Sequence, residues 1–376
     1  MSDNQQPREY DVVLGGQSQS LEGAAVLGGI EGVKFRLSNP DSKVRVAALY
    51  QALNYGEQGL DLVIHSLQHE SPQVQIQAYS LLTSRTELKV KQALLKFNPK
   101  ILKLEPIEVV TVNSYGDIIQ RQQHLAKYFI EDLGNGVTLE MAAIPGGNFM
   151  MGSPENEKSR CDNESPQHKV TVPSFFMGKY PVTQEQYQVI MGNNPSSRRF
   201  SNNLPVECVS WDDAVEFCQK LSQKTGKNYR LPHEAEWEYA CRSGTTTPFY
   251  FGETITPELA NYTLSFLTYA DEPIVKQEKS QSIEEVGTFP PNAFGLYDMH
   301  GNVWEWCQDD CNGNYNYINA PIDGSGWIGQ SIDKRLRGGS YNIYPSHCRS
   351  AFRALHRHNV RYPVLGFRIV ADSFSF

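Results

Sequence analysis

Tryptophan is confined to the C-terminal part of this 376-residue chain. None of the five occurs in the first 210 residues, and four lie between Trp211 and Trp306. Such large rings fill domain interiors, so their absence from more than half of the chain indicates two parts with different cores. The length also suits two domains of about 100 to 200 residues each. We place the boundary near residue 130, between a first domain at 1–130 and a second at 131–376.

The first domain is predicted to be helical. Apolar residues recur every three or four positions after the helix start signal at Asp41, and again after Ser71 and Pro72. The segments NPDSKVRVAALYQAL and ESPQVQIQAYSLL begin about 31 residues apart, a spacing that falls among helical-repeat periods. The pattern is similar to that of HEAT-type repeats, and an ordinary small helical bundle is the alternative. Either fold provides a packing surface for a protein partner and no evident chemistry.

The second domain is predicted to mix short strands, loops and a few helices. Residues 100–112 have the pattern of a strand, and residues 116–132 are predicted to form a helix. Thr183 and Ser210 each precede a helical pattern and have a capping partner three positions later. Two such helices among many short strands are typical of an α+β domain.

Composition restricts the class of partner and the compartment. The chain has 34 Lys and Arg against 42 Asp and Glu, and the net charge of -8 disfavours nucleic acid as a partner. No apolar run approaches the roughly 18 residues of a membrane span, and the first ten residues lack the pattern of a secretory signal. Seven cysteines without close CxxC pairs argue against a disulfide scaffold and a tetrathiolate zinc site. We therefore expect a cytoplasmic protein that does not contact a membrane.

Six sequence blocks between residues 140 and 372 point to a known fold. In chain order they are IPGGNFMMGS, KYPVTQEQY, NLPVECVSWDDAVEFCQKL, YRLPHEAEWEYACRSG, FGLYDMHGNVWEWCQD and RLRGGSYNIYPSHCRSAFR followed by GFRIV. Their order and composition resemble proteins of the formylglycine-generating enzyme (sulfatase-modifying factor) type, and this resemblance implies a variant of the C-type lectin fold. The predicted fold class is therefore α+β, with a C-type lectin fold of this type preceded by an all-α, helical-repeat-like domain.

The resemblance also implies a calcium site around the GNVWEW segment. It carries the ligands over onto Asp298, Glu305 and the main-chain carbonyls of Gly301 and Val303. Oxygen ligands from a loop suit Ca²⁺, and a carboxylate between two indoles needs a partner. The alternative is that Glu305 hydrogen-bonds to backbone and that no metal binds. We expect no required cofactor, with calcium as a structural ion if this site binds one.

Three function classes occur on this fold among the proteins that the chain resembles. They are a copper oxidase, iron-dependent sulfoxide synthases and the non-catalytic variable proteins of diversity-generating retroelements. The oxidase holds Cu(I) between two cysteines five positions apart, because thiolates suit that ion. Here the second position is Cys348 but the first is Ile343, which cannot ligate copper, and the iron motif is absent. We predict that the chain is not an enzyme, and a formylglycine-generating enzyme-like oxidase or its inactive relative is the alternative.

The segment from Tyr341 to Val364 has a restricted alphabet. It contains no Lys, Glu, Gln, Met or Trp, the five amino acids that no codon ending in C encodes. In retroelement variable proteins, adenines of AAC codons are replaced and the third base is kept, which produces this alphabet. An accidental composition in an ordinary loop is the alternative. Within a variable region at 337–370, we predict that a diversified ligand-binding surface is formed by Tyr341, Ile343, Tyr344, Ser346, His347, Phe352, Ala354, Leu355, His356, Arg357, His358, Val360, Tyr362, Pro363 and Val364.

The predicted function is recognition without catalysis. We assign Cys348 to an invariant frame in which Arg349 and Arg353 hold the variable loops through hydrogen bonds. Aromatic and Arg side chains dominate many protein interfaces, and Tyr provides contact area at small entropic cost. The expected partner is an unknown protein or other macromolecular ligand at the variable surface. The local Arg and His residues suit an acidic protein or another anionic target.

Overall fold

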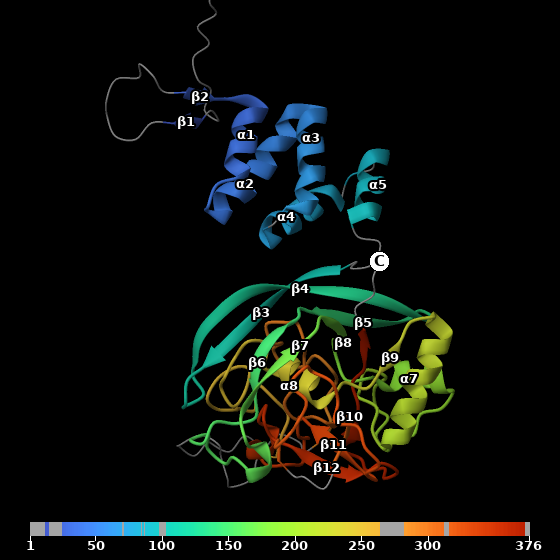
Figure 1. Cartoon of the computed structure of the whole chain (residues 1–376). Coiled ribbons are helices and arrows are strands. Elements are labelled where there is room, and N and C mark those ends of the chain that lie inside the picture. Colours follow the sequence, from blue (N-terminus) through green and yellow to red (C-terminus); the bar gives the residue numbers. More distant parts are fainter. Residues whose placement is uncertain are drawn as a thin grey trace, which may run out of the picture. The chain divides into compact units, whose positions relative to one another are not determined.

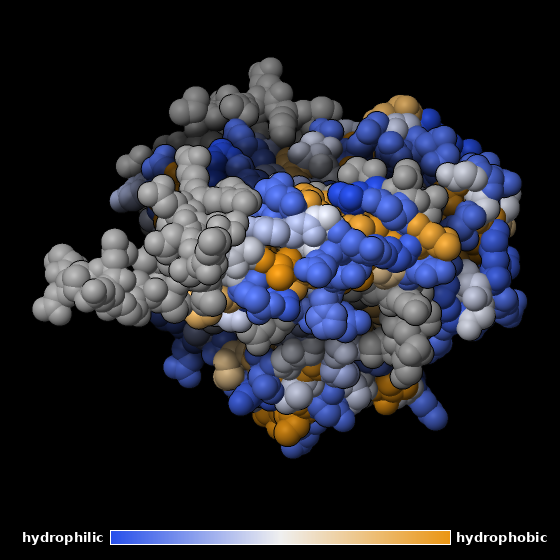
Figure 2. Space-filling model, turned by 90° about the horizontal axis from the view of Figure 1, so that it is seen from above, coloured by the Kyte–Doolittle hydropathy of each residue, from blue (hydrophilic) through white to orange (hydrophobic). Residues whose placement is uncertain are grey.

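The structure is a computed structural model that describes residues 12–14, 25–69, 71–83, 85, 87–97, 103–263, 282–311 and 316–372. Its contacts divide the chain into two compact units, Met1–Pro99 and Lys100–Phe376. This division differs from the predicted boundary near residue 130, because the strands over 103–112 and 118–134 hydrogen-bond into a sheet of the second unit. Across the described ranges no helix has the length and apolar character of a membrane span. The face shown in Figure 2 is mostly hydrophilic, with hydrophobic residues in small separate groups.

The first unit consists of short helices around one apolar core (Figure 1). Asp41 caps one of them, since its side chain accepts the Lys43 N–H at 2.8 Å. The helices predicted after Asp41 and Ser71 are confirmed, whereas the HEAT-type repeat stays a prediction. The elements are β1 (Val12–Leu14), β2 (Ala25–Leu27), α1 (Gly29–Leu37), α2 (Ser42–Ala52), η1 (Leu53–Tyr55), α3 (Gly56–His65), η2 (Ser66–Gln68), α4 (Pro72–Thr83) and α5 (Leu88–Phe97).

Three sheets form the framework of the second unit. Their strand orders are β3-β4-β5-β8-β14-β9, β12-β11-β10-β13 and β6-β7. The strands are β3 (Lys103–Val112), β4 (Ile118–Gly134), β5 (Val137–Ile144), β6 (Gly147–Met151), β7 (His168–Val172), β8 (Phe175–Gly178), β9 (Tyr229–Arg230), β10 (Trp304–Asp310), β11 (Asp333–Arg337), β12 (Ala354–Arg357), β13 (Leu365–Gly366) and β14 (Val370–Asp372). Figure 1 shows β3 and β4 on one side of this unit and β11 and β12 on the opposite side.

The helix predicted over residues 116–132 is wrong, because this stretch belongs to β4. The strand pairs antiparallel with β3 along its first part and with β5 along its last part. Residues 118–123 are all exposed, whereas Tyr128 and Phe129, which point to opposite faces, are both buried. The first part of the strand therefore lacks the alternation of buried and exposed side chains that identifies most strands, and in its last part the alternation shifts by one residue at Tyr128 and Phe129.

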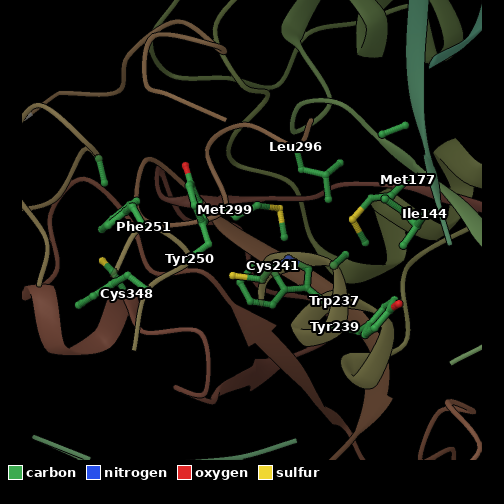
Figure 3. Close-up of a cluster of buried hydrophobic side chains, with 14 of the residues drawn as sticks. Ile144, Met177, Trp237, Tyr239, Cys241, Tyr250, Phe251, Leu296, Met299 and Cys348 are labelled. Carbon is green, nitrogen blue, oxygen red and sulfur yellow. The ribbon is translucent and has the colours of Figure 1, made fainter. Parts of the chain in front are cut away.

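Three helices complete the second unit: α6 (Gln184–Met191), α7 (Trp211–Thr225) and α8 (Glu234–Arg242). The capping predicted at Thr183 and Ser210 is confirmed, because each side chain accepts an N–H from three residues later. Trp237 on α8 and Trp306 on β10 are fully buried in two separate apolar clusters. Figure 3 shows Trp237 with its neighbours in the first cluster. The interior position expected of such large rings is thus confirmed for Trp237 and Trp306.

Candidate functional site

The chain turns sharply at two glycines directly after β11. Gly338 and Gly339 have φ angles of 92° and 80°, which glycine adopts without strain. A β-carbon on Gly339 would lie 2.5 Å from the Sγ atom of Cys348, so this position also requires the smallest residue. The short 3-10 helix η4 (Pro345–Cys348) follows and returns Cys348 to the glycine turn.

Cys348 is a core residue with an unreactive thiol. It is fully buried, and burial raises the pKa of its thiol. Its carbonyl accepts a hydrogen bond from Nδ1 of His300 at 2.7 Å, while Nε2 of His300 accepts the Tyr250 N–H at 3.0 Å. Burial lowers the pKa of His300 to about 3, so the ring is neutral. Figure 3 shows Cys348 and Tyr250 within one buried cluster.

The two positions that correspond to the copper ligands do not form a thiolate pair. Ile343 is half-buried and packs against apolar residues of both clusters. The nearest polar contact of the Cys348 Sγ atom that the structure gives is the Tyr344 carbonyl, at 3.9 Å. An aliphatic side chain cannot replace a thiolate, so these residues do not fit a copper centre. In the described part of the chain, no group of three or more His, Cys, Asp or Glu residues could hold a metal ion.

Buried Arg–Glu pairs fix the backbone beneath the variable segment. Arg349 donates to both carboxylate oxygens of Glu164, at 2.6 and 2.9 Å, and its Nε donates to the Ser346 carbonyl at 2.9 Å. Arg353 donates to both oxygens of Glu234, at 2.8 and 2.6 Å. All four charged side chains are buried. The hydrogen bonds predicted for Arg349 and Arg353 are therefore confirmed.

Main-chain hydrogen bonds connect the variable segment to constant parts of the unit. Four of its carbonyls accept N–H groups: Ile343 from Thr263 at 3.0 Å, His358 from Trp211 at 2.9 Å, Tyr362 from Cys208 at 3.1 Å and Val364 from Trp304 at 2.8 Å. In the opposite direction, the His358 N–H donates to the Ile332 carbonyl at 2.8 Å. These bonds use only main-chain atoms of the segment, so any residue can form the four carbonyl bonds and any residue except proline can form the N–H bond.

Fourteen of the fifteen residues predicted for the surface are exposed or half-buried. Tyr341 is the exception, since it is 6% exposed and packs with Leu204 and Val303. The exposed residues are Tyr344, Arg357, Tyr362 and Pro363. The half-buried ones are Ile343, Ser346, His347, Phe352, Ala354, Leu355, His356, His358, Val360 and Val364. By contrast, the buried residues of the same stretch are Pro345, Cys348, Arg349, Ser350, Ala351 and Arg353.

Aromatic rings connect several of these residues. Four ring pairs have close centroids: His347 with Phe352 at 4.4 Å, Tyr344 with His347 at 6.1 Å, Trp304 with Phe352 at 6.0 Å and His356 with Tyr362 at 5.0 Å. Trp304 is 8% exposed and belongs to the constant part of the chain. We predicted no binding role for Trp304 from the sequence, because no sequence signal shows that its ring lies against Phe352.

Glu305, predicted to ligate calcium, has protein partners instead. Its two carboxylate oxygens accept hydrogen bonds from the guanidinium of Arg368, at 2.9 and 3.1 Å. The indole N–H of Trp237 donates to the same carboxylate at 2.7 Å. Because a buried guanidinium already neutralises the carboxylate, Glu305 does not fit the role of a calcium ligand.

Asp298, Gly301 and Val303, the other predicted calcium ligands, lie buried in the loop before β10. The Asp298 carboxylate accepts the Gly287 N–H at 2.7 Å, and its Oδ1 atom has no partner among the described residues. Burial raises the pKa of Asp298 to about 7. Calcium binding at this loop stays a prediction.

Two cavities lie elsewhere on the second unit. One, of about 340 Å³, is lined by residues that include Ser114, Glu157 and Glu253. The other, of about 300 Å³, is lined by residues that include Phe149 and Tyr239. None of the fifteen predicted surface residues lines either cavity. The predicted surface is thus separate from these two cavities.

Comparisons with known proteins agree with this fold. The sequence model of the sulfatase-modifying factor enzyme 1-like domain family matches residues 132–373. The formylglycine-generating enzyme of Mus musculus is 27% identical over 288 residues, which cover 62% of this chain and 75% of that enzyme. PvdO from Pseudomonas aeruginosa has a TM-score of 0.56 at 31% identity, over 65% of this chain and 98% of that one. Treponema denticola variable protein 1 has a TM-score of 0.54 at 26% identity, over 65% of this chain and 99% of that one.

The family match spans more than half of the chain and nearly all of the second unit after the first part of β4. The predicted fold class, α+β with a C-type lectin fold of the formylglycine-generating enzyme type, is confirmed. Its relatives include both an enzyme and a variable protein. The chain belongs to the family of proteins with a sulfatase-modifying factor enzyme 1-like domain.

Proposed function

We propose that this chain is a non-catalytic ligand-binding protein that displays a diversified surface, as a retroelement variable protein. One observation carries the proposal: the predicted variable residues are exposed or half-buried except Tyr341, and the residues between them that form the frame are buried. Exposed substitutions usually change stability by about 0.5 kcal/mol or less, so this arrangement separates variation from folding. The structural similarity to Treponema denticola variable protein 1 supports it.

The residue at position 343 favours binding over oxidation. Ile343 supplies no thiolate, and Cys348 is buried with a raised thiol pKa. The 27% sequence identity to the mouse formylglycine-generating enzyme supports the alternative, an oxidase-like protein or its inactive relative. A Cu(I) titration distinguishes the two. We expect no stoichiometric binding, and one equivalent of Cu(I) that is lost in Cys348→Ala would favour the alternative.

The compartment, the absence of a required cofactor and the class of ligand are also part of this proposal. All seven cysteines are unpaired, which suits a reducing compartment such as the cytoplasm. The proposed binding requires no cofactor, and the net charge of -8 disfavours nucleic acid as the ligand. The helical first unit offers a separate packing surface for a protein partner.

Sequencing of many copies of the gene tests diversification directly. We expect substitutions concentrated in the codons of the exposed and half-buried residues, each codon keeping C as its third base. The codons for Pro345, Cys348, Ala351 and Arg353 serve as matched controls within the same stretch and should stay constant. Substitutions spread evenly over the stretch, or with any third base, would show an ordinary loop of accidental composition.

A further inference from the structure

Cationic side chains on the predicted surface and next to it are paired with acids from another part of the chain. Arg361 donates to both carboxylate oxygens of Asp213, each at 2.7 Å. The next residue toward the helix start, Asp212, lies 2.7 Å from Nδ1 of His358. Both acids lie in the first turn of α7. The positive charge that the sequence of this segment suggests is therefore largely neutralised by the start of one helix.

His347, which lies between two aromatic rings, is held toward its neutral form. It is half-buried, and burial together with the nearby Arg349 lowers the pKa of its ring. Nδ1 of His356 lies 3.0 Å from the Arg357 main-chain nitrogen. Arg357 is exposed, and the residue opposite it on β11 is Asp333, an acid. A strongly cationic patch is thus absent from the described part of this surface.

An apolar centre remains once these charges are paired. The Tyr344, His347 and Phe352 rings contact one another in series, and Phe352 lies against the constant Trp304. Tyr344 is 42% exposed, so one end of the series is open to a partner. Side chains of Ile343, Phe352, Ala354, Val360 and Val364 all pack on the same buried cluster beneath.

A constant apolar residue lies next to His358. Ile332 is 56% exposed, and its carbonyl accepts the His358 N–H at 2.8 Å. It lies outside the segment of restricted alphabet, so every variant of the surface would keep it.

We propose that this surface binds an uncharged, apolar-centred patch on a folded protein, and that Tyr344, His347 and Phe352 on Trp304 form its energetic centre. The proposal rests on the proposed binding function and names the chemistry of its partner. It replaces the anionic target that the Arg and His content of the segment suggests. Binding is expected to change by less than about two-fold when salt is raised from low to high, because few unpaired charges take part.

The experiment uses the full chain with two probes, indole for an apolar centre and poly-L-glutamate for an anionic target. Binding is followed by NMR on side chains labelled at Phe and Tyr, at low and high salt. Indole should bind on the order of 1 mM, with shifts centred on Tyr344 and Phe352. Phe352→Asn should weaken this binding about five-fold. Tyr115→Asn, which changes a 62% exposed tyrosine in the β3–β4 turn, is the matched control.

Two outcomes would overturn the proposal. One is binding of poly-L-glutamate that falls with salt and is lost in Arg357→Asn. The other is no saturable binding of indole at Tyr344 and Phe352. Neither outcome bears on diversification, which the codon sequencing measures independently, so the failure of the partner chemistry can be told apart from failure of the proposed function.

Discussion

The guanidinium of Arg353, within the variable segment, donates two hydrogen bonds to the carboxylate of Glu234 at the start of α8, at 2.8 and 2.6 Å. Both side chains are at most 4% exposed, although 119 positions separate them in the chain. Removing one partner of such a buried pair is strongly destabilising, because the remaining charge is then unpaired and out of contact with water. The pair therefore fixes the middle of the variable segment to the scaffold.

Arg353→Ala should destabilise the second unit by about 3 to 5 kcal/mol, because it leaves the Glu234 carboxylate buried next to fewer cations. Urea denaturation followed by tryptophan fluorescence measures this. Arg361→Ala is the matched control, since it breaks an ion pair in which Arg361 is 54% exposed and should cost less than about 1 kcal/mol. Equal effects of the two variants would contradict the proposed frame.

Acid should weaken the protein through Glu234. Burial alone would raise the pKa of this carboxyl, but Arg353, Arg335 and Arg337 outweigh burial and lower it from 4.5 to about 2. A lowered pKa in the folded state stabilises the fold above pH 4.5, and this contribution is lost as the pH falls toward 2. The free energy of unfolding, measured from pH 6 down to about pH 3, should fall more steeply for the unmodified protein than for Glu234→Gln.

Substitutions on the surface and in the frame should differ sharply in their effect on stability. A chain with Tyr344→Asn, Arg357→Asn and Tyr362→Asn should melt within a few degrees of the original, because all three side chains are exposed. Ala351→Asn should cost more than about 2 kcal/mol, since it places an amide in a fully buried position of the same stretch. Calorimetry of the two variants makes the comparison, and a large loss in the first would contradict the surface assignment.

Trp306→Ala should destabilise the second unit by about 3 to 5 kcal/mol. The indole is fully buried among apolar residues, and its N–H donates to the Val209 carbonyl at 3.0 Å, so the change leaves both a cavity and an unpaired carbonyl. Trp327→Ala is the control, because Trp327 is only half-buried. Chemical denaturation should show a large loss of stability for Trp306→Ala and only a small one for Trp327→Ala.

Removal of calcium should leave the melting temperature unchanged. Arg368 already pairs with the Glu305 carboxylate, so no vacant negative charge there requires a metal ion. Melting with excess chelator and with added CaCl₂ tests this, since a ligand that binds only the folded state raises its stability. A rise in the melting temperature with calcium that disappears in Glu305→Gln would restore the predicted calcium site.

Local signals in the sequence were enough for part of the fold. The caps at Asp41, Thr183 and Ser210 predicted where helices begin, because each cap uses atoms within three residues. The strand β4 was missed, because its first part is exposed on both faces and because the alternation in its last part is interrupted where Tyr128 and Phe129 are both buried. Its environment depends on β3 and β5, which the local pattern does not describe.

The candidate site, too, could be predicted only in part from the sequence. The restricted alphabet predicted a set of surface positions, and all of them except Tyr341 are exposed or half-buried. The pairing of Arg361 with Asp213 and of His358 with Asp212 was not predictable, because it depends on contacts across more than 140 positions. These contacts also neutralise part of the positive charge that composition suggests for the surface.

The main-chain hydrogen bonds of the variable segment limit which residues it can accept. Carbonyl oxygens are common to all amino acids, but an N–H group is missing in proline. At position 363 the structure shows no hydrogen bond from the main-chain nitrogen, so proline fits there. At position 358, by contrast, the main-chain N–H donates a hydrogen bond to the Ile332 carbonyl. Two base changes convert an AAC codon into CCC, which encodes proline. Mutation would therefore introduce proline equally often at positions 358 and 363. Under the proposed diversification, variants with proline at position 358 would lose this hydrogen bond and fold less stably, whereas variants with proline at position 363 would not.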